Sequence, residues 1–263
     1  MTAYPYVLAD SATMLRRNLR RMRRYPSLTF FIAGIPVVLL LLFVYVFGGT
    51  LGAGIGGGDF GREAYVAYVV PGILLITVAG ATQGTAISVA MDMTEGIIAR
   101  FKTMAIARVS VLTGHVVGSV IQTMLAIAIV MIVAVLIGFR STTGPVEWLA
   151  ATGLLALSAL AMSWIAVALG MAADSVETAS NLPMFLVFMP FLSSGFVPTE
   201  SMPGPLGWFA EHQPFTPLIE TVRGLLVGTP IGDSGVVAVG WCVLFSLVGY
   251  VWSRRLYDRD RAS

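Results

Sequence analysis

Long apolar runs separated by short charged breaks are the feature that most constrains this sequence. The run from Thr29 to Phe47 would reach roughly 28 Å as a helix at ~1.5 Å per residue, close to the hydrocarbon thickness of a bilayer. Of the 263 residues, 57% are hydrophobic and only 11% are charged. Because a soluble domain carries roughly 25% charged residues, this composition favours an integral membrane protein.

The apolar runs predict an all-α fold with six transmembrane helices in one domain over residues 1–263. The predicted spans are 29–47, 66–91, 116–139, 148–171, 179–196 and 236–252. Pro36 should kink the first span, and Pro183 and Pro190 should break the hydrogen-bond ladder of the fifth. The spacing Gly80-x-x-x-Gly84 in the second span is expected to permit close approach of a neighbouring helix.

Arginine residues set the predicted orientation. Fifteen of the sixteen basic residues are arginine. All of the arginines except Arg62, Arg140 and Arg223 lie in the N-terminal region, in residues 92–115 or in the C-terminal tail. Basic residues concentrate on the cytoplasmic side of membrane proteins, so both termini are predicted to be cytoplasmic.

The N-terminal region, residues 4–26, combines apolar residues at helical spacing with a cluster of basic ones. The basic residues are Arg16, Arg17, Arg20, Arg21, Arg23 and Arg24. This pattern predicts an amphipathic helix at the inner membrane surface, attracted to anionic lipid by about 1 kcal/mol per basic residue. A solvated basic tail is the alternative. Beside a membrane span, such a cluster indicates lipid contact rather than nucleic-acid binding.

Residues 92–115 form a charged break between the second and third spans. Apolar residues recur in it at helical spacing (Ile97, Ile98, Phe101, Met104 and Ala105), with Glu95, Arg100, Lys102 and Arg108 around them. The pattern is typical of a helix at the membrane surface, with one side packed and the other offered to water or a partner. An ordinary inner loop whose positive charge sets topology is the alternative.

Residues 197–232 are too apolar for a free loop and too rich in proline for a span. We interpret them as short re-entrant helices on the outer side. Glu220 and Arg223 are three residues apart, which makes them a candidate ion pair on such a helix.

Polar residues within the spans have two interpretations, helix–helix hydrogen bonding or a substrate path. The candidate path residues are Thr82, Gln83, Thr85, Asn181, Ser193 and Ser194. The acidic residues Asp92, Glu95, Asp174 and Glu177 all lie at span ends. Because ion-coupled carriers normally hold ionisable groups near the membrane midplane, this placement argues against proton or sodium coupling.

Enzyme motifs are missing from the sequence. There is no Gly-x-x-x-x-Gly-Lys-Ser/Thr pattern, so any ATP hydrolysis must come from another chain. His115 and His212 do not form a His-Glu-x-x-His pattern, and no Gly-x-Ser-x-Gly elbow is present. The single cysteine, Cys242, permits neither an intramolecular disulfide nor a cysteine-based metal site. We therefore predict no catalytic residue, no metal site and no cofactor in this chain.

Two motifs carry a family resemblance. Glu95-Gly96-Ile97-Ile98-Ala99-Arg100-Phe101-Lys102, followed by Ala107-Arg108, resembles the cytoplasmic signature of type-2 ATP-binding-cassette (ABC) exporter permeases, with the daunorubicin-exporter type as the nearest subgroup. A second match covers Ser193–Pro198, Pro214–Pro217 and Arg223-Gly224. The family usually has proline where this chain has Ala105, and often arginine where it has His115.

The resemblance implies a function and partners. Residues 92–115 would be the coupling segment, with Glu95, Gly96, Arg100, Phe101, Lys102 and Arg108 contacting a separate ATPase subunit. Two ATPase copies would bind ATP and Mg²⁺, and a second permease copy, identical or related, would complete a dimer in the bacterial inner membrane. The expected activity is efflux of a hydrophobic or amphipathic compound such as a drug, polyketide or lipid. Export of polysaccharide or lipid-linked glycan, an ion-coupled carrier and a non-transporting scaffold are the alternatives.

Overall fold

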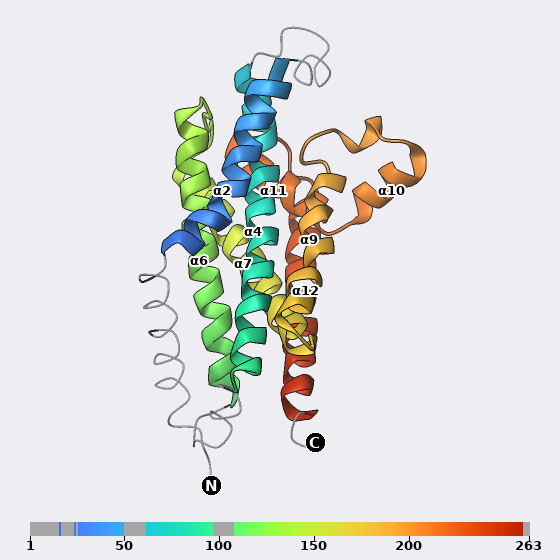
Figure 1. The fold of residues 1–263 in the computed structure, drawn as a ribbon. Coiled ribbons are helices and arrows are strands. Elements are labelled where there is room, and N and C mark those ends of the chain that lie inside the picture. The colour runs from blue at the N-terminus through green and yellow to red at the C-terminus, as the bar shows by residue number, and fades with distance from the viewer. Residues whose placement is uncertain (1–15, 17–23, 25, 50–61, 97–107, 260–263) are drawn as a thin grey trace.

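The fold was determined as a computed structural model that describes residues 16, 24, 26–49, 62–96 and 108–259. Within these ranges all regular elements are helices, which confirms the predicted all-α class (Figure 1). The helices run side by side as an elongated bundle, and α10 (Gly204–His212) projects from its side.

Among the residues that the structure describes, four helices are long and apolar enough to cross a membrane: Glu63–Thr94, Leu112–Leu136, Pro145–Ala172 and Ser234–Tyr257. They belong to α4 (Arg62–Thr94), α6 (Arg108–Leu136), α7 (Pro145–Ala172) and α12 (Ser234–Arg259). These coincide with the predicted second, third, fourth and sixth spans. The chain is therefore a multi-pass membrane protein.

The predicted first and fifth spans contain shorter apolar helices, Ile32–Phe47 and Val176–Leu192. The first comprises α2 (Pro26–Leu42) and a π-helical turn, η2 (Phe43–Phe47). The second is divided into α8 (Val176–Asn181), α9 (Met184–Phe188) and the 3₁₀ helix η3 (Met189–Leu192).

Proline affects these two regions differently. Pro183 immediately precedes α9 and Pro190 lies in η3, so the predicted interruption of the fifth span is confirmed. Pro36, by contrast, lies within α2, and Pro71 lies within the long helix α4. Two prolines seven residues apart leave too little sequence between them for a long α-helix. A single proline is accommodated when neighbouring groups satisfy the freed carbonyl.

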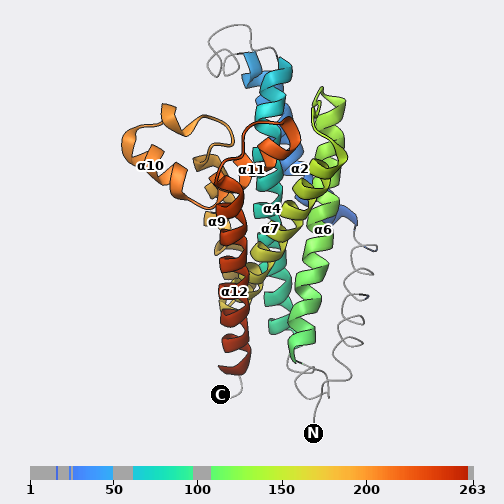
Figure 2. The same ribbon diagram turned by 180° about the vertical axis from the view of Figure 1, so that it is seen from behind.

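Helix α7 lies at the centre of the bundle, where it packs against α4, α6, α11 (Phe215–Val227) and α12. Figure 2 shows α12 crossing beside α7. Glycine allows the closest approaches: a Cβ on Gly170 would lie 2.5 Å from the Ala86 carbonyl oxygen, and one on Gly249 would lie 2.6 Å from the Trp164 carbonyl carbon. The same backbone-to-backbone contact joins Gly72 of α4 to Gly195, where a Cβ on Gly72 would lie 2.9 Å from the Gly195 carbonyl oxygen.

The prediction that Gly80 and Gly84 form a close helix contact is wrong within this chain. A Cβ on Gly80 would meet no atom within 4 Å, and one on Gly84 would meet only Ile32, at 3.9 Å. The spacing alone did not show which face of α4 points at a neighbour. Gly170 and Gly72 instead meet backbone from another element, and Gly80 and Gly84 border open space.

Residues 197–232 form short helices, as the sequence predicts: η4 (Thr199–Ser201), α10 and α11. Helix α11 is almost entirely buried against α4, α7 and α12 and ends at Gly228, whose φ is +83°. Three successive hydroxyls of the α6–α7 loop donate to its last carbonyls: Ser141 to Leu226 (2.7 Å), Thr142 to Val227 (2.7 Å) and Thr143 to Leu225 (2.8 Å). The loop therefore caps a helix that is more than eighty residues away in the sequence.

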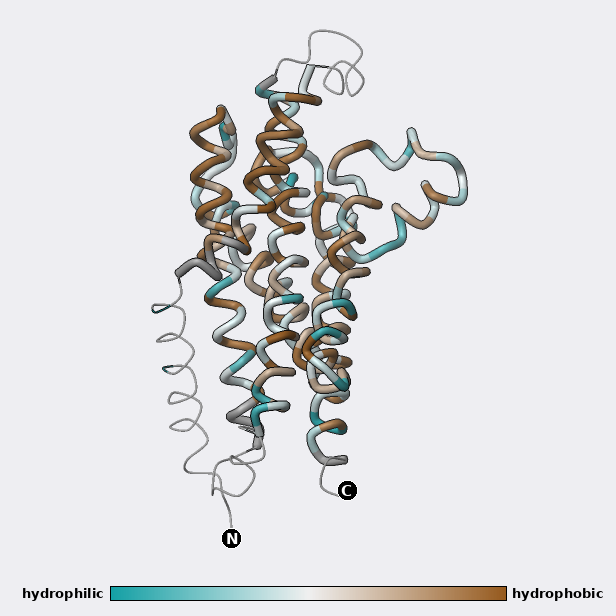
Figure 3. The backbone as a smooth tube through the Cα atoms, viewed as in Figure 1, coloured by the Kyte–Doolittle hydropathy of each residue, from teal (hydrophilic) through white to brown (hydrophobic). Residues whose placement is uncertain are grey.

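Hydrophobic residues make up most of the length of the helices (Figure 3), and many of them are exposed. Val236, Leu247 and Val251 of α12 and Phe30 and Ile35 of α2 are all exposed. An apolar exterior of this extent is expected where lipid rather than water surrounds the helices.

Candidate translocation cavity

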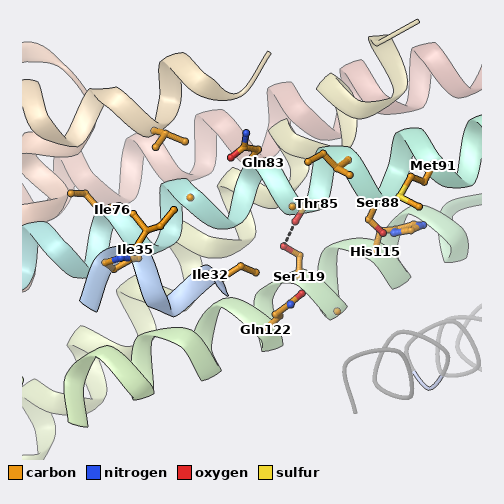
Figure 4. A pocket seen from close by; sticks show the side chains of 16 residues that line it. Ile32, Ile35, Ile76, Gln83, Thr85, Ser88, Met91, His115, Ser119 and Gln122 are labelled. Carbon is orange, nitrogen blue, oxygen red and sulfur yellow. Dashed lines mark hydrogen bonds between the residues drawn. The ribbon is translucent and has the colours of Figure 1, made fainter. Parts of the chain in front are cut away.

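A cavity of about 510 Å³ lies between α2, α4, α6 and α9. It follows α4 from Ile76 to Met91, a length of roughly 22 Å at ~1.5 Å per residue. Its apolar wall comes from Ile32, Ile35 and Pro36 of α2, Ile76, Ile87 and Met91 of α4, and Val187 of α9. The side chains that line it are shown in Figure 4. Gly80 and Gly84 lie on the α4 side, and their missing side chains keep the space open.

Hydrogen-bonding side chains form a second part of the wall: Gln83, Thr85 and Ser88 from α4, and His115, Ser119 and Gln122 from α6. The hydroxyls of Thr85 and Ser119 lie 2.6 Å apart, and Ser163 of α7 donates to Ser119 at 2.9 Å. Gln83 donates to the Ser180 carbonyl of α8 at 2.9 Å. Several of these groups thus join neighbouring helices while they face the cavity.

His115 is the ionisable residue among those that line the cavity. Its Nε2 lies 3.1 Å from Oδ2 of Asp92, and both side chains are buried, with exposed fractions of 8% and 5%. The contact joins the last turns of α4 to the second turn of α6. Sequence reasoning placed Asp92 at a span end and overlooked the pair, although the two residues flank the same charged break.

The predicted path residues fall into two groups. Gln83 and Thr85 line the cavity. Thr82 is buried and donates to the Ala79 carbonyl of its own helix, whereas Asn181 is exposed at the end of α8. Ser193 and Ser194 are buried in the turn that follows η3. Sequence reasoning missed the α6 contribution, although the polar residues Ser119 and Gln122 within an apolar helix pointed to it.

The predicted coupling residues lie where the structure is only partly described. Glu95 is exposed and follows α4 directly. Gly96, at a φ of +69°, provides the left-handed conformation that commonly ends a helix. Arg108 begins α6. Arg100, Phe101 and Lys102 lie outside the described residues, so their predicted contact role stays a prediction.

Of the predicted lipid-contact residues, Arg16 and Arg24 are described, and both are exposed. Arg17, Arg20, Arg21 and Arg23 lie outside the described residues. The interfacial role of the whole cluster remains a prediction.

Arg223 of α11 is the centre of a polar contact near the other end of α4. Its guanidinium donates to the Ser194 carbonyl at 2.7 Å and to the Tyr68 carbonyl at 3.2 Å, and lies over the Tyr68 ring, 4.0 Å from its centroid. The Tyr68 hydroxyl also donates to the Ser194 carbonyl, at 2.9 Å.

The predicted Glu220–Arg223 ion pair is wrong, since Glu220 instead accepts a hydrogen bond from Ser234. The Arg223 guanidinium therefore contacts the Ser194 and Tyr68 carbonyls and the Tyr68 ring rather than the Glu220 carboxylate on its own helix.

Comparison with known proteins identifies the class to which this multi-pass helical protein belongs. The family model described as ABC-2 type transporter matches residues 11–227. The chain therefore belongs to the ABC-2 type transporter family, and the family resemblance noted in the sequence is confirmed.

Two relatives narrow the comparison. The chain is 30% identical over 260 residues to the daunorubicin resistance ABC transporter permease protein DrrB1 of Streptomyces coeruleorubidus, covering 97% of this chain and 88% of the relative. It is 27% identical over 226 residues to the probable doxorubicin resistance ABC transporter permease protein DrrC of Mycobacterium tuberculosis, covering 81% and 79%. The chain is thus homologous to drug-resistance permeases over most of its length.

Proposed function

We propose that this chain is the permease subunit of an exporter that uses ATP to move a hydrophobic or amphipathic compound out of the cell. The observation that carries the proposal is its homology, over 97% of its length, to a permease named for daunorubicin resistance. The cavity adds support, because it offers a bound compound both apolar surface and hydrogen-bonding groups.

The energy would come from a separate ATPase subunit, since this sequence contains no ATP-binding Gly-x-x-x-x-Gly-Lys-Ser/Thr motif. Two copies of that subunit would bind ATP and Mg²⁺ and push on residues 92–108. Phe101 would act as an apolar plug in the ATPase surface, and Glu95, Arg100, Lys102 and Arg108 would orient it. The helices α4 and α6 on either side of this segment both line the cavity, so a movement of residues 92–108 would displace the cavity wall.

The cavity supports an amphipathic cargo rather than a glycan. Isoleucine, proline and methionine make up one side, and neutral amide and hydroxyl groups make up most of the other. A mainly apolar compound with a few hydrogen-bonding groups fits such a lining, whereas a polysaccharide would leave its many hydroxyls against apolar side chains. The exposed apolar face of α2 borders the cavity and would meet lipid or a second permease copy, identical or related.

The placement of basic residues supports an orientation with the coupling segment and both termini in the cytoplasm. In a bacterial inner membrane, the α11 end would then face outward. Transport would therefore run along α4, from the end near Met91 toward the end near Tyr68.

A vesicle assay tests this function. The chain and its ATPase subunit are co-purified and reconstituted into inside-out vesicles, and uptake of a fluorescent anthracycline such as doxorubicin is followed with and without ATP. The expected result is uptake that requires ATP and is lost when the ATPase lysine that contacts phosphate is replaced. Uptake that persists without nucleotide would contradict the proposal.

The Asp92–His115 pair favours a second candidate, a proton-coupled carrier, because buried acid–histidine pairs are typical of proton pathways. The same vesicles separate the two candidates. A proton gradient without ATP should drive no uptake by an ATP-driven exporter, whereas uptake driven by the gradient alone would establish the carrier.

A further inference from the structure

The buried pair of Asp92 and His115 joins α4 to α6 close to the point where each helix meets residues 97–107. Asp92 lies five residues before residues 97–107, and His115 lies eight residues after them. Their 3.1 Å contact therefore closes a loop whose two ends are α4 and α6. A displacement of the α4 or α6 end at this level must either carry both helices together or separate the pair.

His115 also belongs to the cavity wall, together with Ser88 and Met91 of α4 (Figure 4). One contact thus links the end of the cavity to the segment that follows α4. Val89, Leu112 and Val116 pack around the contact with Val167, Met171 and Tyr257. The pair is thus a polar link between α4 and α6 within an apolar cluster.

Removing one partner from a buried acid–histidine contact leaves the other without its closest counterpart, which is costlier than replacing both. The intact contact therefore holds α4 and α6 at a fixed spacing, so that a displacement of one helix at this end reaches the other.

Resting on the export function proposed above, we propose that Asp92 and His115 are positioning residues that couple cargo in the cavity to residues 97–107. With the pair intact, α4 and α6 move as one unit and cargo binding changes the rate of ATP hydrolysis. With the pair broken, cargo still enters the cavity but no longer changes the rate of ATP hydrolysis by the ATPase subunit.

The test measures ATP hydrolysis by the full chain in complex with its ATPase subunit in nanodiscs, with and without doxorubicin. Asp92→Asn and His115→Gln should each lower the ratio of stimulated to basal hydrolysis by roughly fivefold or more. The double variant should be no worse than either single one, since both remove the same contact. His115→Arg should restore the ratio, because its guanidinium can donate to the Asp92 carboxylate. His212→Gln, at the exposed histidine of α10, is the matched control and should not change the ratio.

A reversible cross-link covers the case in which a single variant is unstable. Asp92→Cys and His115→Cys are combined with Cys242→Ser and a cysteine-free ATPase subunit, and the two thiols are joined by a short cleavable reagent. The cross-linked protein should respond to doxorubicin, and the same sample after reduction should not.

Two failures are distinguishable. If the wild-type complex hydrolyses ATP at the same rate with and without doxorubicin and accumulates none, the proposed function fails. If the wild type responds and either the substituted or the reduced cross-linkable protein responds equally, the export function stands and the coupling role of the pair is overturned.

Discussion

The two ends of α4 are held in different ways. Near Tyr68 and Gly72 the helix contacts α11 and the 193–196 turn through the Arg223 guanidinium, a tyrosine hydroxyl and a direct glycine–glycine contact. Near Asp92 it is held by an apolar cluster, by the contact with His115 and, one to two turns away, by the close approach of Gly170 to the Ala86 carbonyl. The α11 end, called the fixed end below, thus depends on hydrogen bonds to backbone carbonyls, whereas the Asp92 end includes a contact between two side chains within an apolar cluster.

The largest expected effect comes from adding a methyl group at the fixed end. Gly72→Ala would place a Cβ 2.9 Å from the Gly195 carbonyl oxygen, where only backbone surrounds it. Overpacking of this kind costs about 1–3 kcal/mol. The midpoint of thermal unfolding in detergent should fall clearly.

Gly84→Ala is the matched control for that substitution, since it lies on the same helix and its Cβ would meet only Ile32, at 3.9 Å. Its unfolding midpoint should stay near the wild-type value. Equal midpoints for the two variants would show that the fixed end of α4 is no more tightly packed than the part of α4 that borders the cavity.

Arg223→Ala should have an effect of similar size. It removes two hydrogen bonds to buried carbonyls and a contact with the Tyr68 ring, and hydrogen bonds from a charged group are worth about 1.5–3 kcal/mol. Hydrogen exchange should then increase in residues 193–198 without a matching increase around Asp92. Arg140→Ala, at an exposed arginine that also donates to carbonyls, should leave that exchange unchanged.

A smaller effect is expected at the loop that caps α11. Thr143→Val removes the hydrogen bond to the Leu225 carbonyl and the contact with the Ser141 hydroxyl, at a cost of about 1 kcal/mol. The unfolding free energy should fall by that amount. Thr152→Val removes only a bond to Trp148 within α7 and should cost less. A larger loss for Thr152→Val would show that the cap does not stabilise the fixed end.

The smallest effect is expected on α10, which projects from the bundle. Trp208 is 64% exposed and stacks on His212 of its own helix. Trp208→Ala should change the unfolding free energy by less than about 0.5 kcal/mol, as is usual for surface positions. A substantial loss of stability in detergent would show that α10 contributes to the packing of the fixed end.

Much of the fold was predictable because apolar length and proline position act locally. The four long spans follow from hydropathy alone, and the division of the fifth region follows from Pro183 and Pro190. The failures concern contacts between elements. The sequence does not specify how each helix is rotated about its axis. That rotation decides which glycines meet the backbone of another element, and whether Arg223 faces Glu220 or the Tyr68 carbonyl.

The candidate site was predictable only in part. Gln83 and Thr85 were identified because polar groups in an apolar span are unusual. Ser193 and Ser194 appeared equivalent by that criterion, but both lie in a buried turn, where Ser193 donates to the Pro190 carbonyl and the Ser194 carbonyl accepts from Arg223. His115 and Asp92 were separated in the sequence by the charged break that they flank, so only the folded chain brings them together.

The most direct test of the central claim, that cargo passes through the cavity along α4, is to fill the cavity. Gly84→Phe would place a ring in the space beside Ile32, whereas Gly153→Phe would place one in open space on α7. ATP-dependent uptake of doxorubicin should be lost in the first variant and kept in the second, with both variants folded and bound to the ATPase subunit. Undiminished uptake by folded Gly84→Phe would contradict the claim.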